Sequence, residues 1–354
     1  MENRIKILRE KFNSLGVDAI YLTSRTSHRY FTAFDNEDGA LLITNNGAYA
    51  FEDFRYIEVA TKNLSGTYTV VEPRGKRSVW LGEILKSENV KRLGFEDLSM
   101  SVNAYERLKS DTNVELAKIG AIINKMREVK TSDEVAKMEK AQIITDKAFE
   151  HILGILSTDI TENDVAAELE YFMRKNGAED KSFETISISA EKTSLPHGVP
   201  SNTKLKKGFF TMDFGAVVDG YHSDMTRTVC IGKADDEMKK LYNTVLEAQL
   251  KALEYLENGG RDCKGADKVA RDIIYKDYKG YFGHSLGHSV GLEIHEMPAL
   301  SPNYEGILVS GNVVTVEPGI YIPSKYGTRI EDMVLICENG IKNFTKSPKN
   351  LIEI

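Results

Sequence analysis

The chain has 354 residues, of which 41% are hydrophobic and 28% are charged, and its formal net charge is −7. At roughly 150 residues per domain, this length predicts about two globular domains, and the composition excludes extended disorder. A mildly acidic chain without a dense Lys/Arg block excludes nucleic acids and anionic membranes as its main partners.

The three cysteines form no CxxC pair and leave one thiol unpaired in any disulfide scheme, which favours a reducing compartment. The N-terminal run MENRIKILREKF is charged throughout and lacks the apolar stretch of a signal peptide. No segment approaches the ~20 consecutive apolar residues of a membrane span. We therefore expect a cytoplasmic protein.

The first third of the chain has the pattern of a mixed α/β domain, expected over residues 1–126. Apolar spacing predicts a helix over 4–15 that ends at Gly16, and short apolar runs after it predict strands. Asn46-Gly47 lies between two such runs and predicts a hairpin. The runs LGEIL and YERLK predict helices.

A second domain, expected over residues 127–354, begins with helical patterns. TSDE, starting at Thr131, predicts a capping box and a helix after it. Another helix follows TEND and stops at Asn176-Gly177, and a third runs from about Asp236 to Leu256.

Apolar strand patterns predict two long hairpins, over 209–231 and 312–336. The first contains Asp213-Phe-Gly and later Thr-Arg, and the second contains Glu317-Pro-Gly and later Thr-Arg. These short matches hint at an internal duplication.

Carboxylates inside these apolar strand patterns are the most informative feature of the sequence. They are Asp213, Asp224, Glu317 and Glu331. An ionised carboxylate is rarely buried without a partner, because its desolvation costs several kcal/mol. Any one of them could face solvent or pair with an arginine. All four together favour a site for two divalent cations, which would balance about four negative charges.

The run HSLGHSVGLEIHE, between the two hairpins, adds His284, His288 and His295. His284 and His288 have the spacing of a helical zinc site, but the glutamate of HExxH is missing and the glycines favour loop or strand. A zincin is therefore disfavoured. Many oxygen ligands with one imidazole suit Mn²⁺, Co²⁺ or Fe²⁺. Two close metals with a bridging hydroxide are a standard means of hydrolysis.

Five runs, in one order, resemble the pita-bread metallopeptidase family: LPHGVP, DFGAVVDGYHSDMTRT, GHSVGLEIHE, VEPGIYIP and TRIED. This family includes Xaa-Pro aminopeptidases, Xaa-Pro dipeptidases (prolidases), methionine aminopeptidases and creatinase. The runs SHRYFTAF and FEDFRY are similar to the first domain of aminopeptidase P and creatinase. The resemblance implies an α+β protein, with a smaller creatinase-like α/β domain before a pita-bread domain of duplicated helix and antiparallel sheet.

The resemblance implies two Mn²⁺ or Co²⁺ ions and a set of metal ligands. The ligands would be Asp213, Asp224, His288, Glu317 and Glu331, with Asp224 and Glu331 bridging the two ions. Glu317 would also orient or deprotonate the attacking water. Ser289 stands where the family usually has glycine, and its side chain could narrow the floor of the pocket.

The resemblance also implies catalytic roles for side chains outside the ligand set. His295 would stabilise the oxyanion or bind the substrate carbonyl, while His197 and His284 would line the substrate side and assist proton transfer. Arg329 would face the same way as Glu331 on a strand and orient it. Without the resemblance, His197 could be an ordinary loop histidine and Arg329 could be purely structural. For His284, a functional role and an ordinary structural role have about equal support.

The choice among relatives depends on what precedes and surrounds these motifs. About 125 additional N-terminal residues count against a methionine aminopeptidase. Intact ligands count against creatinase and against a non-enzymatic binding protein of this family. Relatives of the aminopeptidase P type imply at least a homodimer.

A dipeptidase must recognise the free carboxylate that follows proline. Some prolidases carry an arginine where this chain has Ala299. We therefore expect an Xaa-Pro aminopeptidase, acting on peptides with proline in the second position, with an Xaa-Pro dipeptidase as the alternative. Arg25, Arg29 or Arg55 of the first domain, in the same or a partner subunit, could supply the missing charge.

Overall fold

The computed structural model describes residues 1–354, and the chain forms two compact units, Met1–Ile123 and Asn124–Ile354. Each unit has its own hydrophobic core. None of the helices combines the length and the apolar character that crossing a membrane requires. All three cysteines are free thiols.

The first unit is built on a six-stranded mixed sheet in the order β4-β3-β2-β1-β5-β6. Asn46-Gly47 joins β2 to β3 in an antiparallel hairpin, with Ala40 opposite Phe51, so the predicted hairpin is confirmed. The strands are β1 (Ala19–Leu22), β2 (Ala40–Thr44), β3 (Ala48–Phe51), β4 (Thr69–Val71), β5 (Arg92–Phe95) and β6 (Glu115–Lys118).

The helices of this unit include the two predicted at LGEIL and YERLK, as α5 and α6, and two that the sequence did not predict, α3 and α4. They are α1 (Glu2–Arg9), α2 (Phe12–Leu15), α3 (Arg25–Thr32), α4 (Ile57–Leu64), α5 (Arg77–Ser87) and α6 (Val102–Asp111). The single helix predicted over 4–15 is wrong, because the chain breaks into α1 and α2. Arg9, in the last turn of α1, donates to the carbonyls of Thr44 and Gly47, a contact that local periodicity does not encode.

The second unit contains two helix pairs. The capping box at Thr131 is confirmed: its hydroxyl accepts from the Glu134 backbone, and the Glu134 carboxylate accepts from the Thr131 N–H. The sequence did not predict the helix that begins at Cys263, although Cys263, Ala266, Ala270 and Ile274 recur at helical spacing along its buried face. The pairs are α8 (Ser132–Leu153) with α9 (Glu162–Lys175) and α10 (Asp236–Glu257) with α11 (Cys263–Ile274), and α7 (Ile122–Glu128) crosses the boundary between the two units.

Strands of the second unit form antiparallel sheets, and a 3-10 helix, η1 (Ala190–Ser194), follows β8. The first group is β7 (Asp180–Lys181), β8 (Ile186–Ser189), β9 (Gly208–Phe214), β10 (Ala216–Val218), β11 (Tyr221–His222) and β12 (Met225–Ile231). The second group is β13 (Gly287–Ser289), β14 (Glu296–Leu300), β15 (Val313–Val316), β16 (Gly319–Ile322), β17 (Tyr326–Arg329), β18 (Asp332–Ile336) and β19 (Ile341–Asn343).

Both predicted long hairpins are present, and each is interrupted near its middle. In the first, β9 pairs with β12 and β10 with β11 in one register, with a break where Gly215 lies opposite Asp224. Any Cβ at Gly215 would lie 1.9 Å from the Ser223 carbonyl oxygen. In the second, β15–β18 and β16–β17 keep one register around a break where Glu317 lies opposite Glu331. Carboxylates thus occupy the places where the backbone ladders open.

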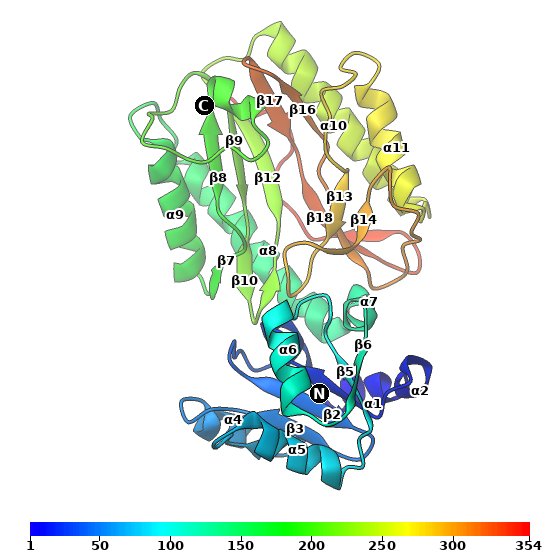
Figure 1. Cartoon of the computed structure of the whole chain (residues 1–354). Coiled ribbons are helices and arrows are strands. Elements are labelled where there is room, and N and C mark those ends of the chain that lie inside the picture. The colour runs from blue at the N-terminus through cyan, green and yellow to red at the C-terminus, as the bar shows by residue number, and fades with distance from the viewer. The chain divides into compact units, whose positions relative to one another are not determined.

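Each hairpin carries one helix pair (Figure 1). Helices α8 and α9 pack on β7, β8, β10 and β11, and α10 and α11 pack on β14 to β17. Apolar side chains of α8 and α9 share one core cluster with the first hairpin, and those of α10 and α11 share another with the second. The interrupted centres of the two hairpins meet between these layers, where the backbone of Glu331 donates to the carbonyl of Thr226.

Candidate metal centre

A cavity of about 770 Å³ lies in the second unit, and every residue predicted as a metal ligand or as catalytic lines it. Its polar wall contains His197, Asp213, Asp224, His284, His288, His295, Glu317, Arg329 and Glu331. Its apolar wall includes Phe183, Ile186, Val199 and Ile294. A pocket with apolar walls and a few convergent polar groups has the form of a small-molecule site.

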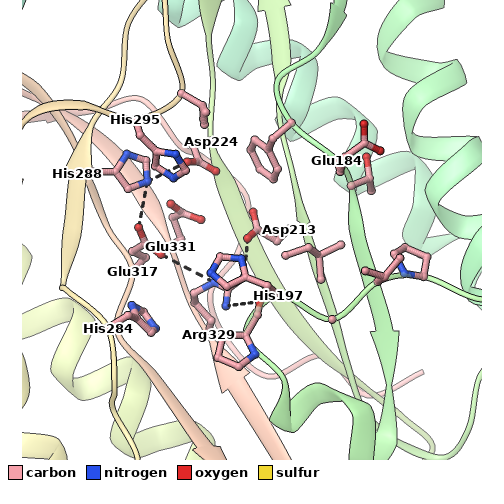
Figure 2. A pocket seen from close by; sticks show the side chains of 18 of the residues that line it. Glu184, His197, Asp213, Asp224, His284, His288, His295, Glu317, Arg329 and Glu331 are labelled. Carbon is pink, nitrogen blue, oxygen red and sulfur yellow. Dashed lines mark hydrogen bonds and ion pairs between the residues drawn. The ribbon is translucent and has the colours of Figure 1, made fainter. Parts of the chain in front are cut away.

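Three potential ligands lie closest together at its base. Ligand atoms of Asp224, His288 and Glu331 are all within 4.8 Å of one another. His288 Nε2 is 3.5 Å from Asp224 Oδ2 and 3.3 Å from Glu317 Oε1 (Figure 2). Asp213 joins the group through Arg329, which bonds its carboxylate. The residues that the sequence placed far apart therefore converge.

Buried oxygen atoms without partners indicate what this group can bind. Asp213 Oδ1 and Glu331 Oε1 are buried and receive no hydrogen bond. A buried acceptor left unpaired costs about 1–3 kcal/mol, and more when it is charged. A divalent cation would satisfy both atoms, and oxygen ligands with one imidazole suit Mn²⁺ or Co²⁺. The donor set therefore fits the predicted metal site.

The ionisation of these carboxyls reflects their crowding. Burial raises the pKa of Asp224 and Glu331 well above the usual range, and repulsion from neighbouring carboxylates raises it further. Burial alone would also raise the pKa of Glu317, but the hydrogen bond and charge of His288 lower it to about 2. The pKa of His288 rises in turn, since Glu317 outweighs the effect of burial. The four carboxylates can all ionise only with additional positive charge nearby.

Arg329 is a buried arginine whose donors are used inside the site. Its guanidinium bonds Asp213, donates from Nε to Thr226 Oγ1 at 2.9 Å and donates from Nη1 to the Tyr321 hydroxyl at 2.7 Å. Thr226 Oγ1 donates in turn to Glu331 Oε2 at 2.7 Å. Arg329 therefore holds Asp213 directly and Glu331 through Thr226, whereas the sequence predicted that it orients Glu331.

The Ser285 carbonyl fixes the proton position on His284. A carbonyl can only accept, so Nδ1 of His284 carries a proton and donates to Ser285 at 2.8 Å. In the neutral imidazole, Nε2 then accepts from the Tyr321 O–H at 3.0 Å, and the Tyr321 oxygen accepts from Arg329. Burial lowers the pKa of His284, which is consistent with this neutral form.

The remaining histidines border the open part of the cavity. The rings of His288 and His295 are edge to face with centroids 4.4 Å apart (Figure 2). Burial and the charge of His288 lower the pKa of His295, so its imidazole is neutral near pH 7. His197 lies in the loop after η1 and is exposed towards the cavity. These imidazoles can donate or accept a proton beside the carboxylate cluster.

Ser289 does not narrow the pocket floor, so that expectation is wrong. Its side chain is fully buried away from the cavity and donates to the Val313 carbonyl at 2.8 Å. Successive residues of a strand point to opposite faces, so a side chain next to His288 leaves the pocket unchanged.

Sequence reasoning missed three hydroxyl groups that support the site. They are Thr226, Tyr321 and Thr315, of which Thr315 donates to Glu317 Oε1 at 3.0 Å and accepts from the His288 backbone at 3.1 Å. Strand alternation could have found Tyr321, because the paired positions Gly319–Arg329 and Tyr321–Gly327 share one face.

The arginines considered as a counter-charge in the first unit are already paired there. Arg25 and Arg29 both bond Asp35, and Arg55 bonds Asp38 and Asp53. In the cavity of the second unit, Arg329 is the single arginine, no lysine lines the wall, and Ala299 is part of it.

Comparison with known families gives two matches. Residues 136–338 match the profile of metallopeptidase family M24, and residues 4–129 match the creatinase/prolidase N-terminal domain. These matches confirm the expected order of a creatinase-like domain followed by a pita-bread metallopeptidase domain.

Proteins named for Xaa-Pro peptidase activity are similar to this chain over nearly its full length. An Xaa-Pro dipeptidase of Pyrococcus furiosus is 37% identical over 355 residues, covering 99% of this chain and all of that protein. The solved structure of an Xaa-Pro dipeptidase from Bacillus anthracis is 40% identical, with a TM-score of 0.95, and covers 100% of this chain and 99% of that one. An X-Pro aminopeptidase structure from Thermotoga maritima is 35% identical, with a TM-score of 0.91, and covers 99% and 100%.

Proposed function

This chain belongs to metallopeptidase family M24, and from that premise we propose that it is an Xaa-Pro dipeptidase. The observation that supports a peptidase is the convergence of Asp224, His288 and Glu331 in one cavity with unpartnered buried oxygens beside them. Similarity to proteins named Xaa-Pro dipeptidase favours this activity over the aminopeptidase that the sequence motifs led us to place first.

We propose that two divalent cations, Mn²⁺ or Co²⁺, are held by the five ligands predicted from the sequence. Bound there, they would activate a water molecule and polarise the peptide carbonyl. Asp224 and Glu331 would be shared between them, since both lie at the centre of the group. Thr226 keeps Glu331 oriented and Thr315 keeps Glu317 oriented through their hydroxyl groups.

The chain's own residues then divide the remaining tasks. Glu317, whose ionised form is stabilised by His288, would take the proton of the attacking water and pass it to the leaving nitrogen. His295 would donate to the oxyanion that develops on the substrate carbonyl. His284, whose pKa is lowered by burial, and the exposed His197 would orient the substrate and assist proton transfer.

An enzyme specific for proline solves a definite chemical problem. An Xaa-Pro bond is a tertiary amide without an N–H, and the ring fixes the φ angle of proline. A peptidase that depends on that N–H loses a contact, whereas polarisation of the carbonyl does not need it. The apolar wall that includes Ile186 and Val199 offers a surface on which a proline ring can pack.

An Xaa-Pro aminopeptidase is the second candidate, and Ala299 favours it. The cavity has no lysine, and its single arginine already bonds Asp213, so no free cation faces a dipeptide carboxylate. A peptide extended beyond proline would not need one.

The deciding experiment compares an Xaa-Pro dipeptide, its C-terminal amide and an Xaa-Pro-Yaa tripeptide, after chelation and addition of Mn²⁺. A dipeptidase should lose about 100-fold in kcat/KM on the amide, because recognition of the free carboxylate is removed. Equal or faster hydrolysis of the tripeptide would overturn the dipeptidase in favour of the aminopeptidase. Glu331→Gln serves as the control and should hydrolyse none of the three.

The assembly and the compartment remain predictions. We expect at least a homodimer, which light scattering would detect as a mass of at least twice the 39.7 kDa chain. The expected cytoplasmic location rests on the sequence alone.

A further inference from the structure

Lys130 is a buried lysine to which the proposed mechanism gives no task. Its side chain is 1% exposed, and Nζ donates to Ser289 Oγ at 3.0 Å and to Glu296 Oε2 at 3.1 Å. Ser289 directly follows His288, and Glu296 directly follows His295. The ammonium group of Lys130 therefore bonds the residue that follows each of the two histidines whose rings meet in the cavity.

The two histidines lie at opposite ends of one loop, and Lys130 bridges the base of that loop. Ser289 of β13 pairs with Glu296 of β14 at a point where the strand register shifts. The Ser289 carbonyl accepts from His288 Nδ1 at 3.1 Å, which leaves Nε2 directed at the carboxylates. The position of Ser289 therefore sets which nitrogen of His288 faces the metal site.

Glu296 has little freedom to move independently of the loop. Its Oε1 accepts from the Glu293 backbone and from Arg127, and its Oε2 accepts from Lys130. A Cβ added at Gly291 would lie 2.6 Å from its carboxylate. The loop backbone thus closes around this side chain.

The cluster is balanced in charge. Lys130 and Arg127 face Glu293 and Glu296, and Arg127 bonds both carboxylates. Lys130 is itself anchored, since its backbone N–H donates to the Gly311 carbonyl at 2.8 Å. Because the backbone and the ammonium group of Lys130 are both held, Lys130 can fix the positions of Ser289 and Glu296.

We propose that Lys130 is a positioning residue that aligns His288 and His295 in the metal centre by bridging Ser289 and Glu296. The inference rests on the proposed function in that both histidines act at this centre. Loss of an outer partner of a metal ligand typically costs 10–100-fold in metal affinity. A lysine that only stabilised the fold would leave that affinity unchanged in a variant that still folds.

The test uses the full chain and two charge-balanced double variants. K130M/E296Q removes the bridge and one carboxylate together, so no buried charge is left unpaired. The matched control, R127M/E293Q, removes Arg127 with its bonds to Glu293 and Glu296 and keeps both contacts of Lys130, with Ser289 and with Glu296. Mn²⁺ affinity is measured by titration calorimetry, kcat and KM with an Xaa-Pro dipeptide, and folding by urea unfolding.

K130M/E296Q should bind Mn²⁺ about 10-fold more weakly or worse, and its kcat should fall about 10-fold at saturating Mn²⁺. The Mn²⁺ affinity and the kcat of R127M/E293Q should both stay within about 2-fold of the values of the unmodified chain. Equal Mn²⁺ affinity in the two double variants would overturn the proposal. If K130M/E296Q does not fold, S289A decides: a drop in Mn²⁺ affinity supports the bridge, and unchanged affinity refutes it.

Mn²⁺ binding separates this inference from the proposed activity. A chain that binds Mn²⁺ but hydrolyses no Xaa-Pro peptide would contradict the dipeptidase and leave the affinity comparison valid. A chain that binds no Mn²⁺ would contradict both.

Discussion

Buried charges at single positions carry much of the chemistry of this protein, and Glu296 shows how one of them is stabilised. Burial alone would raise its pKa, but the charges of Lys130 and Arg127 outweigh burial and lower the pKa below the usual 4.5. Removing one partner of such a buried group lowers the stability of the fold, because a buried charge is then left without its counter-charge.

Glu296→Gln should therefore lower the free energy of unfolding by about 3 kcal/mol at pH 7. A carboxyl with a depressed pKa in the folded state stabilises the protein above its unfolded pKa, and that contribution is lost as the pH falls through the folded value. The difference between the variant and the unmodified chain should hence shrink below about pH 4.5. Urea unfolding at several pH values measures it, and a difference that stays constant down to pH 3 contradicts the assignment.

At the scale of elements, Glu162, the first residue of α9, holds the loop that carries His197 in place through hydrogen bonds. The Glu162 carboxylate is 1% exposed and accepts from the backbone N–H of Ser189 at 2.9 Å and of Ser201 at 3.1 Å. It also bonds Lys192 Nζ at 2.6 Å. One side chain thus joins both ends of the loop between β8 and residue 201.

Glu162→Gln should destabilise the protein by about 1–3 kcal/mol, because an amide presents a donor where the carboxylate accepted. We expect KM for an Xaa-Pro peptide to rise several-fold while the Mn²⁺ content stays the same. Substrate kinetics and metal analysis measure both quantities.

Thr161→Ala is the matched control for the Glu162 prediction. It removes the neighbouring cap of the same helix, at a cost of about 1 kcal/mol, without touching the loop. KM should remain unchanged in this variant. An equal rise of KM in both variants would show that helix stability, not the loop, controls substrate binding.

At the scale of the whole molecule, all five predicted ligands belong to one of the two units. Asn124–Ile354 contains the entire cavity, and Met1–Ile123 has a separate hydrophobic core. A ligand that binds only the folded form stabilises the unit that binds it.

Mn²⁺ at about 100 times its Kd should therefore stabilise the second unit by about 2.7 kcal/mol. This corresponds to a rise in Tm of roughly 5–10 °C for a unit of this size. Differential scanning calorimetry before and after chelation measures the shift. Glu331→Gln, which lacks a central ligand, should show none, and a shift equal to that of the unmodified chain would refute the ligand assignment.

Local sequence patterns predict several helices and turns and point to the candidate site residues. The capping box at Thr131, the helix from Asp236 and the Asn46-Gly47 hairpin depend on interactions between residues close along the chain, so their patterns can be read directly. Four of the proposed metal ligands stand out in the sequence because carboxylates are rare inside apolar strands.

The arrangement of the side chains that support the site becomes visible only in the folded chain. Lys130 and Ser289 are 159 residues apart, and Thr226 and Glu331 are 105 apart, so no local pattern links them. The division of the predicted first helix into α1 and α2, and the opening of both hairpin ladders, likewise appear only in the folded structure. Hydrogen bonds across such separations form only after packing brings the elements together. Neither partner leaves a pattern in the residues next to it, so the sequence does not reveal the bond.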